Sequence, residues 1–267
     1  MRLVYLGTPE MAVPPLEALV AAGHEVALVV TRTDKRRGRG GHTSPSPVKE
    51  AAVRLGLPVS HTVDDVLGVG AELGVVVAFG QIVRPHVLAE LPMVNLHFSL
   101  LPRWRGAAPV ERALLAGDDV TGVGVMAVEE GLDTGGVYAQ IEVPIGPATT
   151  ADALRTELVD RGTELLIDTL DAGLGTPVEQ VGTPVYAAKI DPAELRIDWS
   201  RPVAEIDRLI RVGGAWTTFR GDRLKIHAAE IIDGELVPTI VQPAGKPRMA
   251  AHAWRNGARP ADGEWFE

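Results

Sequence analysis

The chain has 267 residues, of which 46% are hydrophobic, and it carries a formal net charge of −9 with no cysteine. This length allows one sizeable core and a smaller second one. The lack of cysteine excludes disulfide bonds, thiolate metal ligands and a cysteine nucleophile. The acidic balance argues against a protein that coats nucleic acid through its overall field, whereas a local basic patch still suffices to bind phosphate.

The first predicted element is a short buried strand at Leu3–Leu6 that ends at Gly7. Its apolar run is too short for a signal-peptide core or a membrane span, so we expect a cytoplasmic protein with no membrane partner. The turn at Gly7–Glu10 lies where a dinucleotide-binding enzyme carries its phosphate loop. It has one glycine where that fingerprint needs three, which favours a plain tight turn over a nucleotide site.

Alternating helix and strand patterns then predict an α/β fold with a doubly wound, mostly parallel sheet. A helix at Met11–Ala22 has two prolines in its first turn and ends before Gly23. Further helices are expected at Ser46–Leu55, Ala108–Ala116 and Thr150–Ala172. Further strands are expected at Glu25–Thr31, Leu73–Phe79, Met93–Phe98, Thr121–Val128 and Val137–Val143.

From Gly173 the composition changes to glycine, proline, threonine and scattered charge, which indicates a linker. A helix at Pro202–Val212 and then strands at Trp216–Arg220, Leu224–Ile232 and Glu235–Val241 indicate a small β-rich domain. We therefore divide the chain into a first domain at 1–184, a linker at 185–200 and a small domain at 201–267. The C-terminal stretch from Pro243 shows little periodicity, so we expect it to lie along the surface.

The strand at Met93–Phe98 places three polar side chains on one face, because side chains in a strand alternate faces. Asn95, His97 and Ser99 share that face, at the strand end where open α/β sheets bind ligands. The pattern points to an amide and an imidazole that act on one ligand. The same pattern is also typical of a strand end whose polar groups only hydrogen-bond the next loop.

A second candidate is Asp133, which lies in a glycine-bounded turn between two predicted strands. An aspartate in such a turn often only hydrogen-bonds its own backbone. Beside an imidazole, however, a carboxylate helps to hold or move a proton near neutral pH, and a neighbouring amide stabilises an oxyanion. No histidine and carboxylate spacing indicates a metal site, and no nucleophile elbow or Walker loop is present.

A glycine-rich loop at Arg32–His42 concentrates five basic residues beside one aspartate, in a chain that is acidic as a whole. Such a concentration favours binding of a polyanion. A solvated loop without a ligand has the same composition, so the charge run alone leaves both interpretations open.

Two segments together resemble the signature of the folate-dependent formyltransferases: Asn-x-His-x-Ser-Leu-Leu-Pro at Asn95–Pro102 and Gly-Leu-Asp-Thr-Gly at Gly131–Gly135. Within that family the chain resembles the branch that formylates methionyl-tRNA. The runs that carry this second likeness are Gly7–Glu10, Gly38–Gly40, Ser44–Lys49, Ser99–Pro109, Tyr186–Ile190 and Arg196–Ser200. The resemblance therefore covers most of the chain.

The resemblance implies a Rossmann-like formyltransferase domain at 1–184 and a shortened OB-like domain at 201–267. It implies that Asn95, His97 and Asp133 are the catalytic trio, with 10-formyltetrahydrofolate as the formyl donor and no metal. The amine of methionine on the initiator tRNA attacks the formyl carbon. Asn95 and His97 then stabilise the tetrahedral oxyanion, while Asp133 orients His97 and helps the proton to move.

The resemblance also implies binding residues for both substrates, in a protein that we expect to be a monomer. The reduced folate is expected to contact Phe79, Gly80, Ile82, Ser99, Leu100, Leu101 and Pro102. The acceptor stem of methionyl-initiator tRNA is expected to contact Arg32, Lys35, Arg36, Arg37 and Arg39. Contacts of shape and phosphate suit double-stranded RNA, whose deep groove side chains cannot read.

The sequence departs from the family pattern in three places. The small domain lacks residues before Trp216 and a pair of strands around Glu230–Pro243, which reduces the surface for RNA. The loop at Arg32–Arg37 replaces a proline-containing turn, and Gly136 replaces an acidic residue. These departures leave two alternatives: an N-formyltransferase for a small amine such as an amino sugar or siderophore precursor, and a non-catalytic paralogue that binds tRNA or folate.

Overall fold

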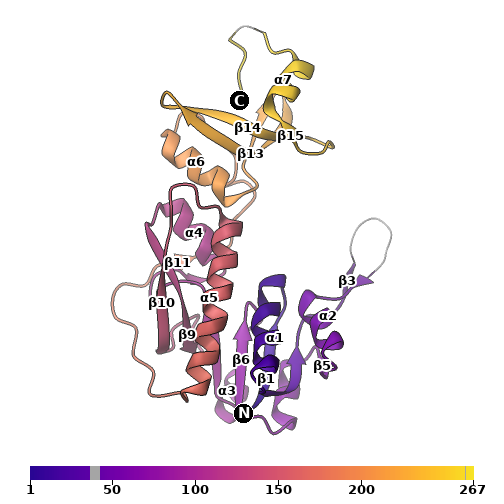
Figure 1. Ribbon diagram of the computed structural model, residues 1–267, viewed down its shortest axis with the longest axis vertical. Coiled ribbons are helices and arrows are strands. Elements are labelled where there is room, and N and C mark those ends of the chain that lie inside the picture. Colours follow the sequence, from indigo (N-terminus) through magenta and orange to yellow (C-terminus); the bar gives the residue numbers. More distant parts are fainter. Residues whose placement is uncertain (37–42, 262) are drawn as a thin grey trace. The chain divides into compact units, whose positions relative to one another are not determined.

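The computed structural model describes residues 1–36, 43–261 and 263–267 (Figure 1). The chain divides into two compact units, and each has its own sheet and hydrophobic core. The first unit comprises Met1–Pro109, Val120–Pro144 and Arg155–Ala187, and the second comprises Val110–Asp119, Ile145–Leu154 and Ala188–Glu267. No helix of the described residues is long and apolar enough to cross a membrane.

Within the described residues, the main sheet of the first unit has seven strands in the order β10-β9-β7-β6-β1-β2-β5. They are β1 (Arg2–Gly7), β2 (Glu25–Val30), β5 (Val59–Ser60), β6 (Leu73–Val77), β7 (Met93–His97), β9 (Val120–Ala127) and β10 (Val137–Pro144). The first five run parallel, whereas β9 is antiparallel to both β7 and β10. The predicted mostly parallel, doubly wound sheet is thus confirmed. Its winding reverses between β1 and β6, and open α/β sheets bind ligands at such a point.

Both faces of the central strands β1, β6 and β7 are buried, which explains why these strands are nearly continuous apolar runs. Val4 and Leu6 of β1 belong to a core shared with residues of the 3-10 helix η2 (Val63–Gly68) and of α3 (Pro85–Glu90). Tyr5 alternates to the opposite face, where its hydroxyl donates to a backbone carbonyl at the end of η1. The sheet is therefore a rigid base for the loops at its carboxyl edge.

The other helices of the first unit are η1 (Glu10–Ala12), α1 (Val13–Ala21), α2 (Pro47–Arg54) and the larger part of α5 (Ala151–Asp171). Two short strand pairs complete it: β3 (Lys35–Arg36) with β4 (Thr43–Ser44), and β8 (Arg105–Gly106) with β11 (Tyr186–Ala187). The long helices lie within a few residues of their expected bounds. α3 was not predicted, because its six residues are too few to show a helical period.

The second unit contains an antiparallel sheet which, in the part of the chain that the structure describes, has the order β12-β13-β14-β15. Its elements are most of α4 (Pro109–Ala116), α6 (Val203–Val212), β12 (Trp216–Phe219), β13 (Asp222–Ile232), β14 (Glu235–Pro243), β15 (Met249–Ala250) and α7 (Ala251–Ala258). Ile206 and Ile210 of α6 share a core with Ile226 and Val241 of the sheet. The predicted small β-rich domain is confirmed.

The C-terminal stretch from Pro243 is mostly exposed, as expected, but part of it also packs against the core of the second unit. Ala251, Trp254 and Phe266 belong to the core of the second unit or pack against it. The last residue is also fixed, because the backbones of Thr218 and Glu267 exchange hydrogen bonds of 3.3 and 2.9 Å. α7 buries one residue, Ala251, among polar ones, which is too weak a pattern to reveal a helical period.

Candidate active site

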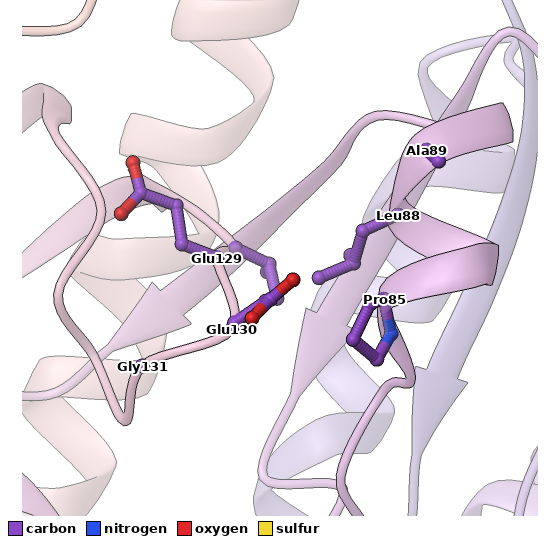
Figure 2. A pocket seen from close by; sticks show the side chains of 7 residues that line it. Pro85, Leu88, Ala89, Glu129, Glu130 and Gly131 are labelled. Atoms are coloured by element: carbon purple, nitrogen blue, oxygen red, sulfur yellow. The ribbon is translucent and has the colours of Figure 1, made fainter.

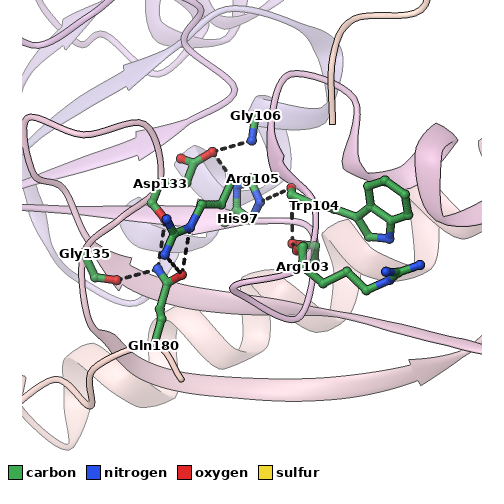
Figure 3. A network of polar contacts seen from close by, with 9 residues as sticks. His97, Arg103, Trp104, Arg105, Gly106, Asp133, Gly135 and Gln180 are labelled. Carbon is green, nitrogen blue, oxygen red and sulfur yellow. Dashed lines mark hydrogen bonds and ion pairs between the residues drawn. The ribbon is translucent and has the colours of Figure 1, made fainter. Parts of the chain in front are cut away.

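β7 carries Asn95 and His97 on one face and delivers them to the carboxyl edge of the first sheet. His97 is 5% exposed. Its Nε2 lies 3.0 Å from the carbonyl oxygen of Trp104 (Figure 3). Because a carbonyl only accepts hydrogen bonds, Nε2 must carry the hydrogen, and the neutral ring has its free electron pair on Nδ1.

Asp133 faces this free nitrogen. Its Oδ2 lies 3.6 Å from Nδ1 of His97 and also accepts a hydrogen bond of 2.7 Å from the N–H of Gly106 (Figure 3). The side chains of His97 and Asp133 are only 6% and 14% exposed. A carboxylate in this position stabilises the imidazole once Nδ1 has taken up a proton. The structure thus brings together the two side chains that the sequence singled out as partners.

The amide of Asn95 is half-buried and, within the described residues, has no hydrogen-bond partner. In the sheet Asn95 lies opposite Val76 of β6 and Met126 of β9, so its backbone is fixed on both sides. An unpaired amide on a fixed strand can donate to a developing oxyanion without first breaking another contact. The described residues hold no group of three or more histidine, aspartate or glutamate side chains that fits a metal ion.

The loop after β7 is largely closed on itself. Ser99 is buried, and its hydroxyl donates to the carbonyl oxygen of Arg103 at 2.6 Å. Leu101 is buried, and Leu100 lies so close to Gly122 that a Cβ there would collide with it. Pro102 is half-buried. The contact of Ser99, Leu100, Leu101 and Pro102 with a folate stays a prediction.

A cavity of about 480 Å³ lies between α3 and the turn after β9 (Figure 2). It is lined by Pro85, Leu88, Ala89, Val128, Glu129, Glu130 and Gly131. Leu88 and Glu130 point toward one another across it (Figure 2). This volume is within the range of small-molecule sites, and one wall is apolar while the other offers carboxylates. Because Asp133 follows in the same turn, the cavity lies close along the chain to the candidate catalytic group.

None of the seven residues expected to bind the folate lines this cavity, and three of them, Phe79, Gly80 and Ile82, precede α3 in the chain. Phe79 is 5% exposed and belongs to the core beside Val83 and Val87, whereas Ile82 is 84% exposed. The cavity is instead lined by α3, a few residues further along the chain. That helix was not predicted from the sequence, and the apolar wall of the cavity was therefore not predicted either.

Two of the five basic residues expected to bind tRNA, Arg37 and Arg39, lie outside the described residues. Lys35 is exposed on β3, and Arg36 follows it in the same strand. Arg32 donates from Nη1 to a neighbouring backbone carbonyl. The one aspartate of the loop, Asp34, pairs at 2.8 Å with a lysine of α2 and therefore does not offset the loop's own positive charge.

Two side chains to which the sequence analysis gave no role complete the surroundings of Asp133. Arg105 is buried and donates from Nε and Nη2 to Oε1 of Gln180 at 3.0 and 2.6 Å. Gln180 in turn donates to the carbonyl oxygens of Asp133 and Gly135 at 2.8 and 2.7 Å (Figure 3). A single glutamine in a segment rich in glycine and proline carries no periodic or motif signal, so nothing in the sequence indicated this contact.

Known proteins match this chain over its whole length. The profile of the formyl transferase family matches residues 1–170, and that of the formyl transferase C-terminal domain matches residues 189–237. A methionyl-tRNA formyltransferase from Roseobacter denitrificans is 43% identical over 304 aligned residues, which cover 100% of this chain and 99% of that protein. The chain belongs to the formyl transferase family. The resemblance seen in its motifs is thereby confirmed.

Solved structures of other formyl transferases share the fold. Methionyl-tRNA formyltransferase from Clostridium thermocellum is similar over 91% of this chain and 98% of its own, with a TM-score of 0.63 and 15% identity. The sugar 3N-formyltransferase WlaRD, solved in the presence of dTDP and 5-N-formyl-THF, is similar over 92% and 99%, with a TM-score of 0.66 and 17% identity. At such identities the likeness establishes the fold of this formyl transferase and leaves its acceptor open.

Proposed function

We propose that this formyl transferase moves the formyl group of 10-formyltetrahydrofolate to the α-amine of methionyl-initiator tRNA, the modification that precedes translation initiation. The observation that carries the proposal is the setting of His97, with Nε2 bonded to a carbonyl and Nδ1 facing Asp133. A relative with 43% identity over the whole chain carries the name of this activity. The basic residues of the loop at Arg32–Arg36 supply charge for an RNA phosphate.

In the proposed reaction the free amine of methionine attacks the formyl carbon, and the carbonyl electrons move onto oxygen. The amide of Asn95 donates to that oxyanion. Nδ1 of His97 takes the proton that the attacking nitrogen loses and passes it to N10 of the folate, while Asp133 stabilises the ring in its charged form. The C–N10 bond then breaks, the carbonyl re-forms, and formyl-methionyl-tRNA and tetrahydrofolate leave. The transfer is direct, with no covalent enzyme intermediate.

The cavity beside α3 is where we place the pterin ring of the folate. Leu88 offers an apolar wall for the ring, and the carboxylates of Glu129 and Glu130 can accept from its amine and ring N–H groups. The formyl group would then extend past Gly131 toward Asp133 in the same turn. Phe79, Gly80 and Ile82 would contact the folate from the segment that precedes α3.

We retain the assignment of residues 1–184 as the formyltransferase domain, 185–200 as a linker and 201–267 as a reduced OB-like domain. In this scheme the basic loop, including Arg37 and Arg39, contacts the acceptor stem. The monomeric, cytoplasmic state also remains part of the proposal. A monomer suffices for the chemistry, because Asn95, His97 and Asp133 all come from one chain.

A formylation assay tests the acceptor directly. The purified chain is incubated with 10-formyltetrahydrofolate and one of three acceptors: charged initiator tRNA, uncharged initiator tRNA, or a set of small amines that includes an amino sugar and a siderophore precursor. We expect formyl-methionine on the charged tRNA only. Product on a small amine without product on tRNA would favour the first alternative function.

The second alternative, a non-catalytic paralogue, predicts binding without product. A single-turnover experiment separates it from slow catalysis, with enzyme in excess over charged tRNA. One equivalent of formyl-methionyl-tRNA supports the proposed reaction. Binding of tRNA or folate with no product over hours would contradict it, because the Asn95, His97 and Asp133 side chains would then lack the assigned role.

A further inference from the structure

Gln180 lies in a segment that returns to the Asp133 turn and is fixed at both of its ends. At one end Val178 exchanges two backbone hydrogen bonds with Val137 of β10, at 2.8 and 2.9 Å. At the other end the carbonyl of Val185 accepts from the N–H of Arg105 at 2.9 Å. Gln180 is therefore held between two anchors, opposite the turn that carries the candidate catalytic carboxylate.

The side-chain amide of Gln180 uses its full hydrogen-bonding capacity. Its oxygen accepts twice from Arg105, and its nitrogen donates once to the carbonyl of Asp133 and once to that of Gly135 (Figure 3). An amide has two donor hydrogens and two acceptor electron pairs, so no site is left over. Arginine only donates and carbonyls only accept, which fixes which end of the amide faces which partner.

The turn that Gln180 holds has an unusual backbone. Asp133 has a φ of 52°, in the left-handed region that residues with a side chain rarely adopt. Such a conformation persists only where the surroundings hold it, and it is typical of functional sites. The clamp acts on the carbonyl of this same residue, whose Oδ2 faces Gly106 and His97.

Gly136 makes room for the returning segment, and Gly135 makes room for the end of β9. A Cβ at Gly136 would lie 2.9 Å from Cβ of Pro177, and a Cβ at Gly135 would collide with the backbone of Ala127. Gly136 is the position at which the sequence departs from the acidic residue of the family pattern. The departure thus has a physical account, because a longer side chain there would push Pro177 and Val178 away and take Gln180 with them.

We propose that Gln180 is a positioning residue for formyl transfer, which clamps the backbone of the Asp133 turn so that the carboxylate faces His97. The inference rests on the proposed function for its kinetic consequence but not for its geometry. Gln180 does not touch the reacting atoms in this scheme. It acts through Asp133, and Arg105 in turn fixes the orientation of its amide.

The kinetic experiment uses Gln180→Glu. Glutamate has the same size and keeps an oxygen for both Arg105 donors, but it places a second oxygen against the carbonyls of Asp133 and Gly135. We expect kcat to fall by about tenfold to a hundredfold, the range for a small misplacement of a catalytic group, with unchanged KM for both substrates. Gln140→Glu, at an exposed glutamine of the same unit, is the matched control and should keep the wild-type kcat.

A positioning role differs from a structural one in how the change combines with Asp133→Asn. If Gln180 acts through the carboxylate, Gln180→Glu should reduce kcat little further once that carboxylate is gone. Equal fold losses in both backgrounds, or a wild-type kcat for Gln180→Glu, would overturn the inference. Gln180→Met, which removes the amide without adding charge, should give the same pattern with the wild-type KM.

A crystal structure of Gln180→Met provides a readout that does not depend on the acceptor. We expect Asp133 to leave its left-handed conformation and Oδ2 to lose its contacts with Gly106 and His97. An unchanged Asp133 side chain would overturn the inference even if the enzyme formylates methionyl-tRNA. Conversely, a displaced side chain would support the clamp even if the assays show a different acceptor.

Discussion

In two regions of this protein a segment from far along the chain packs back onto an earlier one. Different kinds of interaction hold the two returning segments in place. At the Asp133 turn the returning segment makes directed hydrogen bonds, through the amide of Gln180 and the backbone of Val178. In the second unit the C-terminal tail returns through aromatic packing. Phe266 stacks on Trp199 with ring centroids 5.2 Å apart and on Trp254 at 5.8 Å.

This difference in the kind of contact indicates a different role for each returning segment. A hydrogen bond weakens steeply when its angle or length changes, so a set of them fixes the direction of a side chain. Aromatic contact removes apolar area from water and stabilises strongly, but it tolerates several ring geometries. We therefore expect changes at the first region to affect the rate of reaction and changes at the second to affect stability.

The largest effect on rate is expected for His97→Gln. Glutamine keeps an N–H that can reach the carbonyl of Trp104 but has no counterpart of Nδ1, so it cannot take the proton. Loss of general acid–base catalysis lowers rates by about 10² to 10⁴, and we expect kcat to fall within that range. Single-turnover formylation measures it, and the melting temperature should stay near the wild-type value.

The matched control for this change is His252→Gln, at an exposed histidine of the second unit. It should leave both the rate and the melting temperature unchanged. A wild-type rate for His97→Gln would contradict the assigned role. A large fall in the melting temperature would instead show that the hydrogen bonds around His97 and Asp133 also stabilise the fold. The proposed difference between the two regions would then be wrong.

The second region is tested by Phe219→Ala. Phe219 is 8% exposed, and its ring meets Trp254 edge to face at 5.0 Å. Truncation of a buried phenylalanine costs about 3–5 kcal/mol, so the free energy of unfolding of the second unit should fall by that amount. Denaturant titration followed by tryptophan fluorescence measures it. At temperatures below the transition, kcat should stay within a few fold of wild type, and a loss like that of His97→Gln would contradict the comparison.

The sequence predicted the sheet well, because buried parallel strands are short apolar runs separated by turns. Leu73–Val77 and Met93–His97 fall inside their expected ranges. It predicted α3 and α7 poorly, since both are short and bury few side chains. Their stability comes from tertiary contacts, and a pattern along the chain contains those contacts only indirectly.

The candidate site shows the same division. Asn95 and His97 were found from the alternation within one strand, and Asp133 was found from its turn and from the resemblance. Gln180 was not found, because its partner carbonyls lie 47 and 45 residues away and backbone carbonyls leave no trace in a sequence. The bond from His97 to the carbonyl of Trp104 was hidden for the same reason.

A smaller effect is expected for Lys35→Ala. Lys35 belongs neither to the Asp133 turn nor to the contacts of the C-terminal tail. If Lys35 contacts an RNA phosphate, its loss should raise the KM for charged tRNA a few fold and reduce the slope of log affinity against log salt by about 1. The KM for 10-formyltetrahydrofolate should not change. Arg54→Ala removes a positive charge elsewhere in the same unit, where it pairs with Glu17, and serves as the control. An unchanged salt slope for Lys35→Ala would remove this residue from the RNA contact.

The smallest effect is expected for Glu264→Gln. This change weakens the ion pair between Arg220 and Glu264, the main polar contact of the C-terminal tail. Arg220 donates to both carboxylate oxygens of Glu264 at 2.6 Å, and these hydrogen bonds, with one from the backbone of Ala261, lower the pKa of Glu264 from 4.5 to about 2. A lowered pKa in the folded state means that the contribution to stability is complete above pH 4.5 and is lost as the pH falls toward 2. The side chains of Arg220 and Glu264 are 51% and 27% exposed, so water screens the pair and its contribution is small even at neutral pH.

The melting temperatures of wild type and Glu264→Gln, measured from pH 7 to pH 2, should therefore differ slightly at neutral pH and converge in acid. High salt should also reduce the difference. The aromatic contacts carry no charge and should persist under all of these conditions. A difference at pH 7 as large as that caused by Phe219→Ala would show that a directed polar contact, and not apolar packing, closes the tail, and the two regions would then be held by the same kind of force.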